Sequence, residues 1–186
     1  MSDVLYETPR LIARRWQDRD RAPFAALNGD PEVMRYFPAP LTRAESDLMI
    51  DGIEARMDKD GFGFPAIERK ADGAFVGLVG LAPVRFEAPF TPAVEIGWRL
   101  AREHWGLGYA SEAAWTVLGC GFEHLELDEI VSFTATSNLP SQKVMQAIGM
   151  QNNPADDFAH PNLPEGHPLR PHVLYRINRQ GWLATL

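Results

Sequence analysis

Length, composition and charge exclude several classes of protein before any motif is considered. With 186 residues and 45% apolar content, the chain has room for a single domain, residues 1–186, with a full core. The net charge of −7, without a basic run, argues against nucleic-acid binding and mildly favours a cationic amine as substrate. No apolar run approaches the roughly 20 residues of a membrane span, so we expect a cytoplasmic protein with no membrane partner.

The N-terminal part predicts a strand followed by short helices. Residues 10–16 alternate apolar and polar side chains, as a half-buried strand does. Residues 18–29 follow as a helix that ends at Asn28-Gly29. A further helical turn then leads to Tyr36 and Phe37, which belong either to the core or to the mouth of a pocket, with the core favoured.

A longer helix follows. Thr42 and Glu45 have the spacing of a capping box, in which each side chain accepts a hydrogen bond from the other residue's backbone N–H. The helix should run to about Lys59 and end at Gly61. Its expected apolar stripe is Leu48, Ile53 and Met57.

Three strands come next. Residues 62–69 and 75–81 form a hairpin through a polar turn that ends in Gly73. Residues 93–100 form the third strand, whose side chains alternate between two faces. One face carries Val94, Ile96 and Trp98, and the other carries Glu95, Gly97 and Arg99.

The second half begins with the clearest helix of the chain. Apolar residues recur at steps of three and four over residues 110–125, and a strand rich in β-branched residues follows at 130–136. This strand should be the parallel neighbour of residues 93–100, because a helical crossover joins the two. A short helix over 138–148, a long loop over 150–171 and a last strand over 172–178 complete the chain.

The segment HWGLGYASEAA, residues 104–114, predicts an anion site. Gly106 and Gly108 free the backbone to approach a ligand, and a helix starts directly after them. Unpaired N–H groups and the positive end of the helix dipole favour a pyrophosphate there. A Rossmann fingerprint fits poorly, because Ser111 stands where its third glycine is required and the loop lies past the middle of the chain.

Several motifs resemble the GNAT superfamily of acetyl-CoA-dependent N-acetyltransferases, and within it the RimJ/RimL-like branch. The superfamily loop has Gln or Arg at its first conserved place, where this chain has Glu103, but its three small positions match. WGLGYASEA resembles the branch motif WGxGYAxEA, and further motifs follow in family order: ETPRL, DPEVMRYFP, EIGW, SNLPSQKVMQAIGM and HVLYR. The resemblance implies an α+β fold, a mixed, twisted sheet of about six or seven strands flanked by about four helices.

The resemblance also implies the cofactor. Acetyl-CoA would lie across the glycine loop, with its pyrophosphate on backbone amides from Leu107 to Ser111. Asn138 matches the family residue that bonds the pantetheine arm, and Lys143 or Arg102 could meet the adenosine phosphates, although exposed cations are usually only solvated. The cofactor-binding residues expected from the resemblance are Trp105, Gly106, Leu107, Gly108, Tyr109, Ala110, Ser111, Asn138 and Lys143.

Acetyl transfer to an amine needs a base and then an acid. Glu95 is the candidate base, because a carboxylate beside an apolar cleft can have a raised pKa; the alternative is a structural acid. Many family members place a tyrosine acid after the asparagine, and this chain has none between Asn138 and Gly149. By resemblance Ser141 takes that role, directly or through water, while its alternative is helix capping.

Two other hypotheses remain at this point. The missing tyrosine keeps open a non-catalytic acyl-CoA-binding or regulatory module, and a homodimer is left open as the assembly. We expect no metal, because His160, His167 and His172, with nearby Asp156 and Asp157, have irregular spacing in a proline-rich loop. That loop would instead contact the acceptor, with Trp16, Tyr36 and Phe37 as apolar walls, and the acceptor itself is set by loops rather than by the fold.

Overall fold

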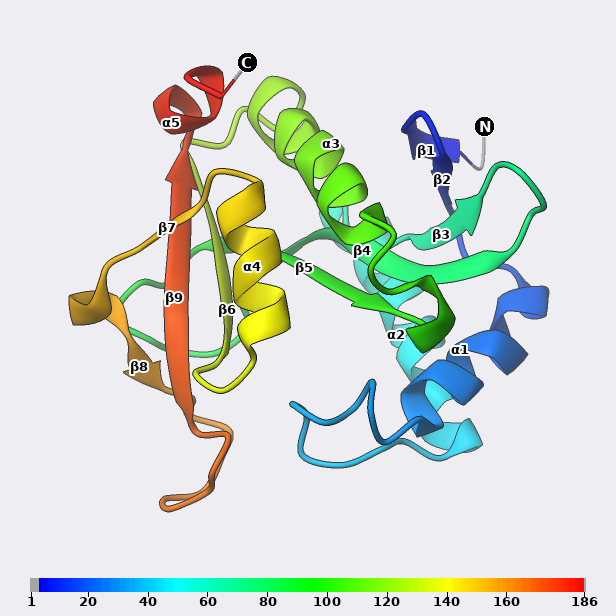
Figure 1. Ribbon diagram of the computed structural model, residues 1–186, viewed down its shortest axis with the longest axis horizontal. Helices are drawn as coiled ribbons and strands as arrows, with labels where there is room; N and C mark the ends of the chain where they lie inside the picture. The colour runs from blue at the N-terminus through cyan, green and yellow to red at the C-terminus, as the bar shows by residue number, and fades with distance from the viewer. Residues whose placement is uncertain (1–3, 186) are drawn as a thin grey trace.

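The computed structural model describes residues 4–185, which form one mixed sheet covered by helices on both faces (Figure 1). The strand order is β1-β2-β3-β4-β5-β6-β9-β7, and β8 also pairs with β9. All described pairings are antiparallel except β5 with β6. The strands are β1 (Val4–Glu7), β2 (Leu11–Arg14), β3 (Ala66–Arg69), β4 (Phe75–Pro83), β5 (Val94–Leu100), β6 (Glu129–Ala135), β7 (Gln151–Asn152), β8 (Phe158–Ala159) and β9 (Pro171–Asn178).

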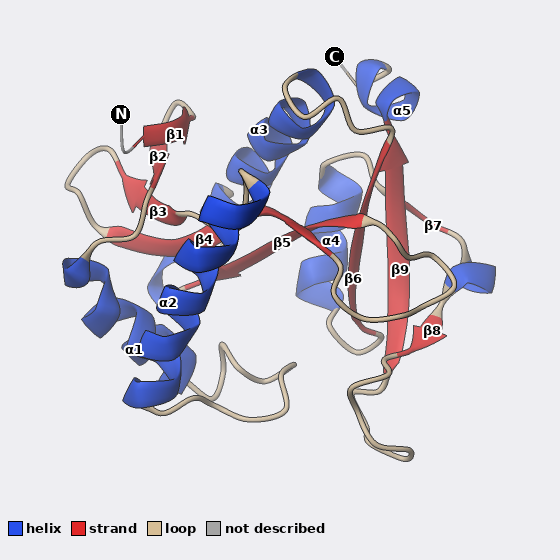
Figure 2. Cartoon of the chain, turned by 180° about the vertical axis from the view of Figure 1, so that it is seen from behind, coloured by secondary structure: helices blue, strands red, loops and turns tan. Residues whose placement is uncertain are grey.

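The helices divide between the two faces of the sheet. Helices α3 and α4 lie on the face seen in Figure 1, whereas α1 and α2 cover the opposite face, seen in Figure 2. The helices are α1 (Arg21–Gly29), α2 (Arg43–Asp60), α3 (Tyr109–Glu123), α4 (Leu139–Ala147) and α5 (Arg179–Leu183). No helix in this described part of the chain is both long and apolar enough to cross a membrane.

Each face has its own hydrophobic core. On the α3 face, Leu118 and Phe122 pack in one cluster with Ile96 and Ile130. On the other face, residues of α1 and α2 cluster with Leu78 of β4. Burial of apolar side chains on both sides of β4 fixes this strand in the middle of the molecule.

Helix α2 confirms its predicted ends and corrects its predicted stripe. Thr42 and Glu45 form the capping box, and Gly61 ends the helix in the left-handed conformation at φ 80°. Leu48 is 69% exposed, so its prediction as a core residue was wrong. The buried stripe instead runs through Ile50, Ile53 and Met57, because the helix is rotated so that this face meets the sheet.

The α+β class is confirmed, but the sheet within residues 4–185 has nine strands rather than six or seven, and there are five α-helices rather than four. The additional elements are short: β7 and β8 have two residues each, too few to show a periodicity in sequence. Both pair with β9, so part of the segment expected as a loop over 150–171 is an edge of the sheet.

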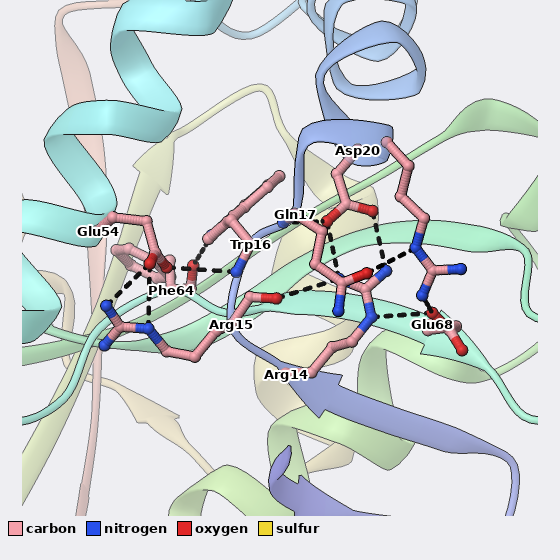
Figure 3. A network of polar contacts seen from close by, with 9 residues as sticks. Arg14, Arg15, Trp16, Gln17, Asp20, Glu54, Phe64 and Glu68 are labelled. Carbon is pink, nitrogen blue, oxygen red and sulfur yellow. Dashed lines mark hydrogen bonds and ion pairs between the residues drawn. The ribbon is translucent and has the colours of Figure 1, made fainter. Parts of the chain in front are cut away.

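A buried ion network joins the first strands to the helices that cover them (Figure 3). The Arg14 guanidinium at the end of β2 donates two hydrogen bonds to Asp20, of 2.7 and 2.9 Å, and one of 2.8 Å to Glu68 on β3. The Arg14 and Asp20 side chains are only 6% and 2% exposed. Beside them, Arg15 pairs with Glu54 of α2 at 2.8 Å, so the last residue of β2 and the residue after it anchor different elements.

Replacing Asp20 by Asn tests this network, since it removes a charge and keeps the size of the side chain. We expect the free energy of unfolding to fall by about 3 kcal/mol, because a buried guanidinium loses one of its two carboxylates. Urea unfolding at neutral pH measures the change. Asp18→Asn is the matched control, because the Asp18 side chain is 99% exposed in the same turn. Equal unfolding midpoints for the two variants would show that the network does not stabilise the fold.

Candidate functional site

The site is built where two parallel strands separate. Strands β4 and β5 pair over seven residues, as do β6 and β9, but β5 and β6 share one registered pair, Glu95 with Val131. A hydrogen bond of 2.9 Å from Ser132 Oγ to the Ile96 carbonyl closes the contact. Beyond it the two strands diverge (Figure 1). The predicted parallel pairing is therefore confirmed, and it joins the two strands at one end only.

The glycine loop after β5 has the geometry of an anion cradle. Gly106 and Gly108 have φ of 72° and 80°, which side-chain-bearing residues rarely adopt. Gly108 also caps α3, so the helix begins without a side-chain cap. Within residues 4–185, no acceptor pairs with the backbone N–H groups of residues 106–111. Consecutive unpaired donors at the positive end of a 15-residue helix suit a phosphate group.

Residues of the connection between β1 and β2 hold this glycine loop in place. Arg10 donates to Glu112 Oε2 at 2.6 Å and to the Leu107 carbonyl at 2.9 Å, and it lies 4.5 Å from the centre of the Tyr109 ring. The Thr8 hydroxyl donates to Glu112 Oε1 at 2.5 Å. Burial raises the pKa of Glu112, but the hydrogen bonds from Thr8 and Arg10 outweigh it, so this pKa lies below its ordinary value. Glu112 is thus a structural anchor, as its place in the first helical turn predicts.

The other expected cofactor residues lie at the loop and at the start of α4. The Trp105 indole donates to the Leu100 carbonyl at 2.9 Å, and Trp105 and Leu107 are about half exposed, at 47% and 46%. Tyr109 is buried, whereas Ala110 and Ser111 are half-buried. The Asn138 side chain accepts from the Ser141 N–H at 3.2 Å and donates to Thr134 at 2.9 Å, while Lys143 is exposed.

Glu95 lies on the face of β5 that is turned toward α1 and α2. Its neighbour Ile96 packs in the core on the α3 side, whereas Arg99, on the face of Glu95, contacts α1 and α2. Burial raises the pKa of Glu95 to about 7. Among residues 4–185 no group donates a hydrogen bond to its carboxyl. A proton acceptor that titrates near neutrality therefore lies beside the point where β5 and β6 separate.

The structure places Ser141 and the expected apolar walls in different environments. The expected walls are Trp16, Tyr36 and Phe37. The Ser141 N–H completes the cap of α4, as the structural alternative predicted, and its hydroxyl has no partner among the described residues. Trp16 belongs to the core and donates to the Phe64 carbonyl at 2.8 Å, so it is not an exposed wall. Tyr36 and Phe37 lie outside both cores, and Phe37 is 36% exposed, so the favoured core assignment for the pair was wrong.

Two of the histidines, His160 and His172, take part in an aromatic cluster. Their ring centres lie 4.9 Å apart, and they pack against Phe86, Phe133 and Phe158, which Phe90 joins through the other phenylalanines. Burial lowers the pKa of both histidines. In the described chain, no group of three or more His, Cys, Asp or Glu side chains is arranged to hold a metal ion. Ring packing accounts for these residues, which form the β6–β9 side of the site.

Sequence reasoning missed Arg99. The alternation of β5 had placed it on the face of Glu95, but nothing in the sequence indicated how it would be partnered. Its Nη1 donates to Asn28 of α1, and its guanidinium lies 4.1 Å from the centre of the Phe37 ring. Gly97 separates the two charged residues, and a Cβ there would come within 3.2 Å of the Phe64 ring. Glu95 and Arg99 thus flank an aromatic ring on one surface.

Comparison with known proteins agrees with this geometry. Residues 10–151 match the family described as Acetyltransferase (GNAT) domain. The chain belongs to this acetyltransferase family. A relative in the GNAT family is the FsC-acetyl coenzyme A-N(2)-transacetylase of Aspergillus fumigatus, 34% identical over 84% of this chain and 68% of that protein.

Solved GNAT structures share the fold. A GNAT-family acetyltransferase from Bacillus anthracis superimposes with a TM-score of 0.78 at 24% identity, covering 94% of this chain and 98% of that one. The spermidine N-acetyltransferase of Vibrio cholerae, solved with CoA and spermine, has a TM-score of 0.73 at 19% identity, over 93% of this chain and 98% of that one. At these identities the likeness concerns the fold alone.

Glu95 makes the stability of the protein depend on pH. Its pKa of about 7 in the folded protein exceeds the ordinary value of 4.5, so between these values the folded protein holds a proton that the unfolded chain has released. Stability is therefore lost as the pH rises, by at most about 3 kcal/mol between about pH 5 and about pH 8. Glu95→Gln cannot titrate and lacks this loss. Urea unfolding of both proteins at the two pH values should give a difference that grows with pH; a constant difference would show that Glu95 ionises equally freely in both states.

Proposed function

We propose that this GNAT protein transfers the acetyl group of acetyl-CoA to a primary amine by direct attack in a ternary complex. The observation that carries the proposal is Glu95, a half-buried carboxyl with a pKa of about 7 at the start of the divergence of β5 and β6. A base must be unprotonated at working pH and still take a proton readily, and a pKa near neutrality meets both conditions.

In this proposal the cradle holds the pyrophosphate of CoA. The unpaired N–H groups of residues 106–111 support it, as does the presence of CoA in the Vibrio cholerae relative. Trp105 and Lys143 would lie along the nucleotide, and Asn138, which keeps one amide hydrogen and one lone pair free, would meet the pantetheine arm. The WGLGYASEA motif favours the RimJ/RimL-like branch.

The chemistry follows from these positions. Glu95 takes a proton from the acceptor ammonium, and the neutral amine attacks the thioester carbonyl, forming a C–N bond. The tetrahedral intermediate collapses with cleavage of the C–S bond. The nitrogen of the intermediate loses its second proton, which passes through the Ser141 hydroxyl or a water to the departing thiolate, since the usual tyrosine is missing. Positioning of the two reactants contributes much of the rate, because a thioester is already reactive toward amines.

Gly108→Val tests the cradle. The added Cβ would lie 3.4 Å from the Arg10 guanidinium, beside the proposed anion site, on a backbone with φ of 80°, which costs about 1–3 kcal/mol for a non-glycine residue. We expect CoA binding to be abolished in calorimetric titration while the protein remains folded. Gly166→Val is the matched control, because Gly166 has φ of 79° with open space around it and lies in the 160–171 segment. Unchanged CoA affinity in the Gly108 variant would place the cofactor elsewhere.

Glu95→Gln tests the catalytic base. With acetyl-CoA and a panel of amines and peptides, we expect thiol release to fall about 100-fold and to lose its rise with pH near 7, while CoA affinity stays the same. Glu87→Gln, at an exposed position of the β4–β5 connection, should behave as the wild type. Tight CoA binding without thiol release by the wild type across the whole panel would instead support the non-catalytic module.

A further inference from the structure

Arg99 is a half-buried charged side chain that has no counter-ion among residues 4–185. Its Nη1 donates to Asn28 Oδ1 at 2.6 Å and lies 3.8 Å from Met49 Sδ, and its Nε is buried without an acceptor. No carboxylate of residues 4–185 forms an ion pair with it. Arg14, the other arginine enclosed on this side of the sheet, is paired with two carboxylates.

The charge of Arg99 persists at neutral pH. Burial lowers its pKa to about 10, which still leaves the guanidinium protonated. A buried cation without a partner is costly, and buried charges in proteins are normally paired. The contacts that Arg99 does make, an amide oxygen, a thioether and an aromatic face, orient the group without neutralising it. Among the described residues Nη2 has no acceptor either and, unlike Nε, it is not fully enclosed, so it is the atom left for an anion from outside.

The position of Arg99 relates it to the acceptor. It follows Glu95 by four residues on the same face of β5, so the two Cα atoms are about 13 Å apart along the strand. The ring of Phe64 lies over Gly97 between them. Phe37 comes from the connection between α1 and α2, which extends toward the ends of β6 and β9 in both views (Figures 1 and 2). A molecule whose amine meets Glu95 and whose other end meets the guanidinium would lie along this face, past the Phe64 ring.

We propose that Arg99 binds a carboxylate of the acceptor, so that the substrate is a primary amine carrying an anionic group several bonds away, such as an ω-amino acid or a short peptide. The inference rests on the proposed function and specifies its acceptor class. A guanidinium binds a carboxylate through charge-assisted hydrogen bonds in a fixed geometry, which gives both affinity and orientation. Binding of the substrate carboxylate at Arg99 would then place the amine, at the other end of the substrate, near Glu95.

The competing role for Arg99 is purely structural, as a link from β5 to α1 and α2. A structural loss affects all acceptors equally, whereas loss of a carboxylate site affects only acceptors with the anion. Matched pairs of substrates separate the two roles: ω-amino acids of increasing length, from 4-aminobutanoate to 8-aminooctanoate, and the corresponding amides.

The experiment measures kcat/KM for thiol release with each pair in the wild type, Arg99→Gln and Arg99→Lys. For the best chain length, we expect the wild type to prefer the acid over its amide by roughly 10- to 100-fold, the value of hydrogen bonds to a charged group. Arg99→Gln should lose this preference while its rate with the amide is retained, and Arg99→Lys should recover part of it. Arg43→Gln, at an exposed position in the first turn of α2, is the control and should keep the preference.

Three results would overturn the proposal: no preference for acids in the wild type, an equal fall for acid and amide in Arg99→Gln, or an unchanged preference in that variant. If the variants do not fold, the wild type alone decides, because a simple alkanoate of the best length should inhibit competitively against the amine and the alkanamide should not. Thiol release with amides but no preference for acids overturns only the role of Arg99. No release with any amine removes the proposed function itself.

Discussion

The separation of β5 from β6 after one registered pair is the constraint on which the rest of the site depends. Two parallel strands that stayed paired would satisfy each other's backbone groups and leave no room between them. Here the pairing ends at Glu95, and a hydrogen bond from Ser132 holds the junction. The antiparallel partners β4 and β9 keep each diverging strand rigid over its full length. Because each diverging strand is held by an antiparallel partner, a ligand can bind between the two halves of the sheet without any domain movement.

The molecule distributes its buried charges unequally. In the network of Arg14 and Asp20, each charge is neutralised by a neighbour, and the result is attachment of helices to the sheet. On β5 the opposite arrangement holds, since Glu95 and Arg99 lack ionic partners within the described chain. Burial of a charged side chain without an ionic partner destabilises the fold. It is commonly found where a ligand supplies the missing interaction. The net negative charge of the chain, which mildly favoured a cationic substrate, says less about the acceptor than this one enclosed cation.

Features set by local chemistry could be predicted from the sequence. The capping box of α2, the glycine conformations at 106 and 108 and the parallel crossover depend on neighbouring residues or on chain handedness, and the structure contains all three. Features set by packing could not. Leu48 has the character of a core residue, yet the rotation of α2 exposes it, and the lack of a partner for Arg99 is a property of every element around it. The alternation of β5 carried the only available signal, because it placed Arg99 on the face of Glu95.

The order of the strands has a consequence for how the chain folds while it is being synthesised. Strands β1 to β5 are sequential neighbours, so this part of the sheet can assemble in the order in which it leaves the ribosome. Strand β6 differs, because its antiparallel partner β9 follows it by more than thirty residues and covers it over seven pairs. The half of the molecule that carries Glu95 can therefore form before the half that carries Asn138 is anchored. Under the proposed function, a nascent chain would carry Glu95 and the glycine loop before Asn138, the proposed contact of the pantetheine arm, is held in place.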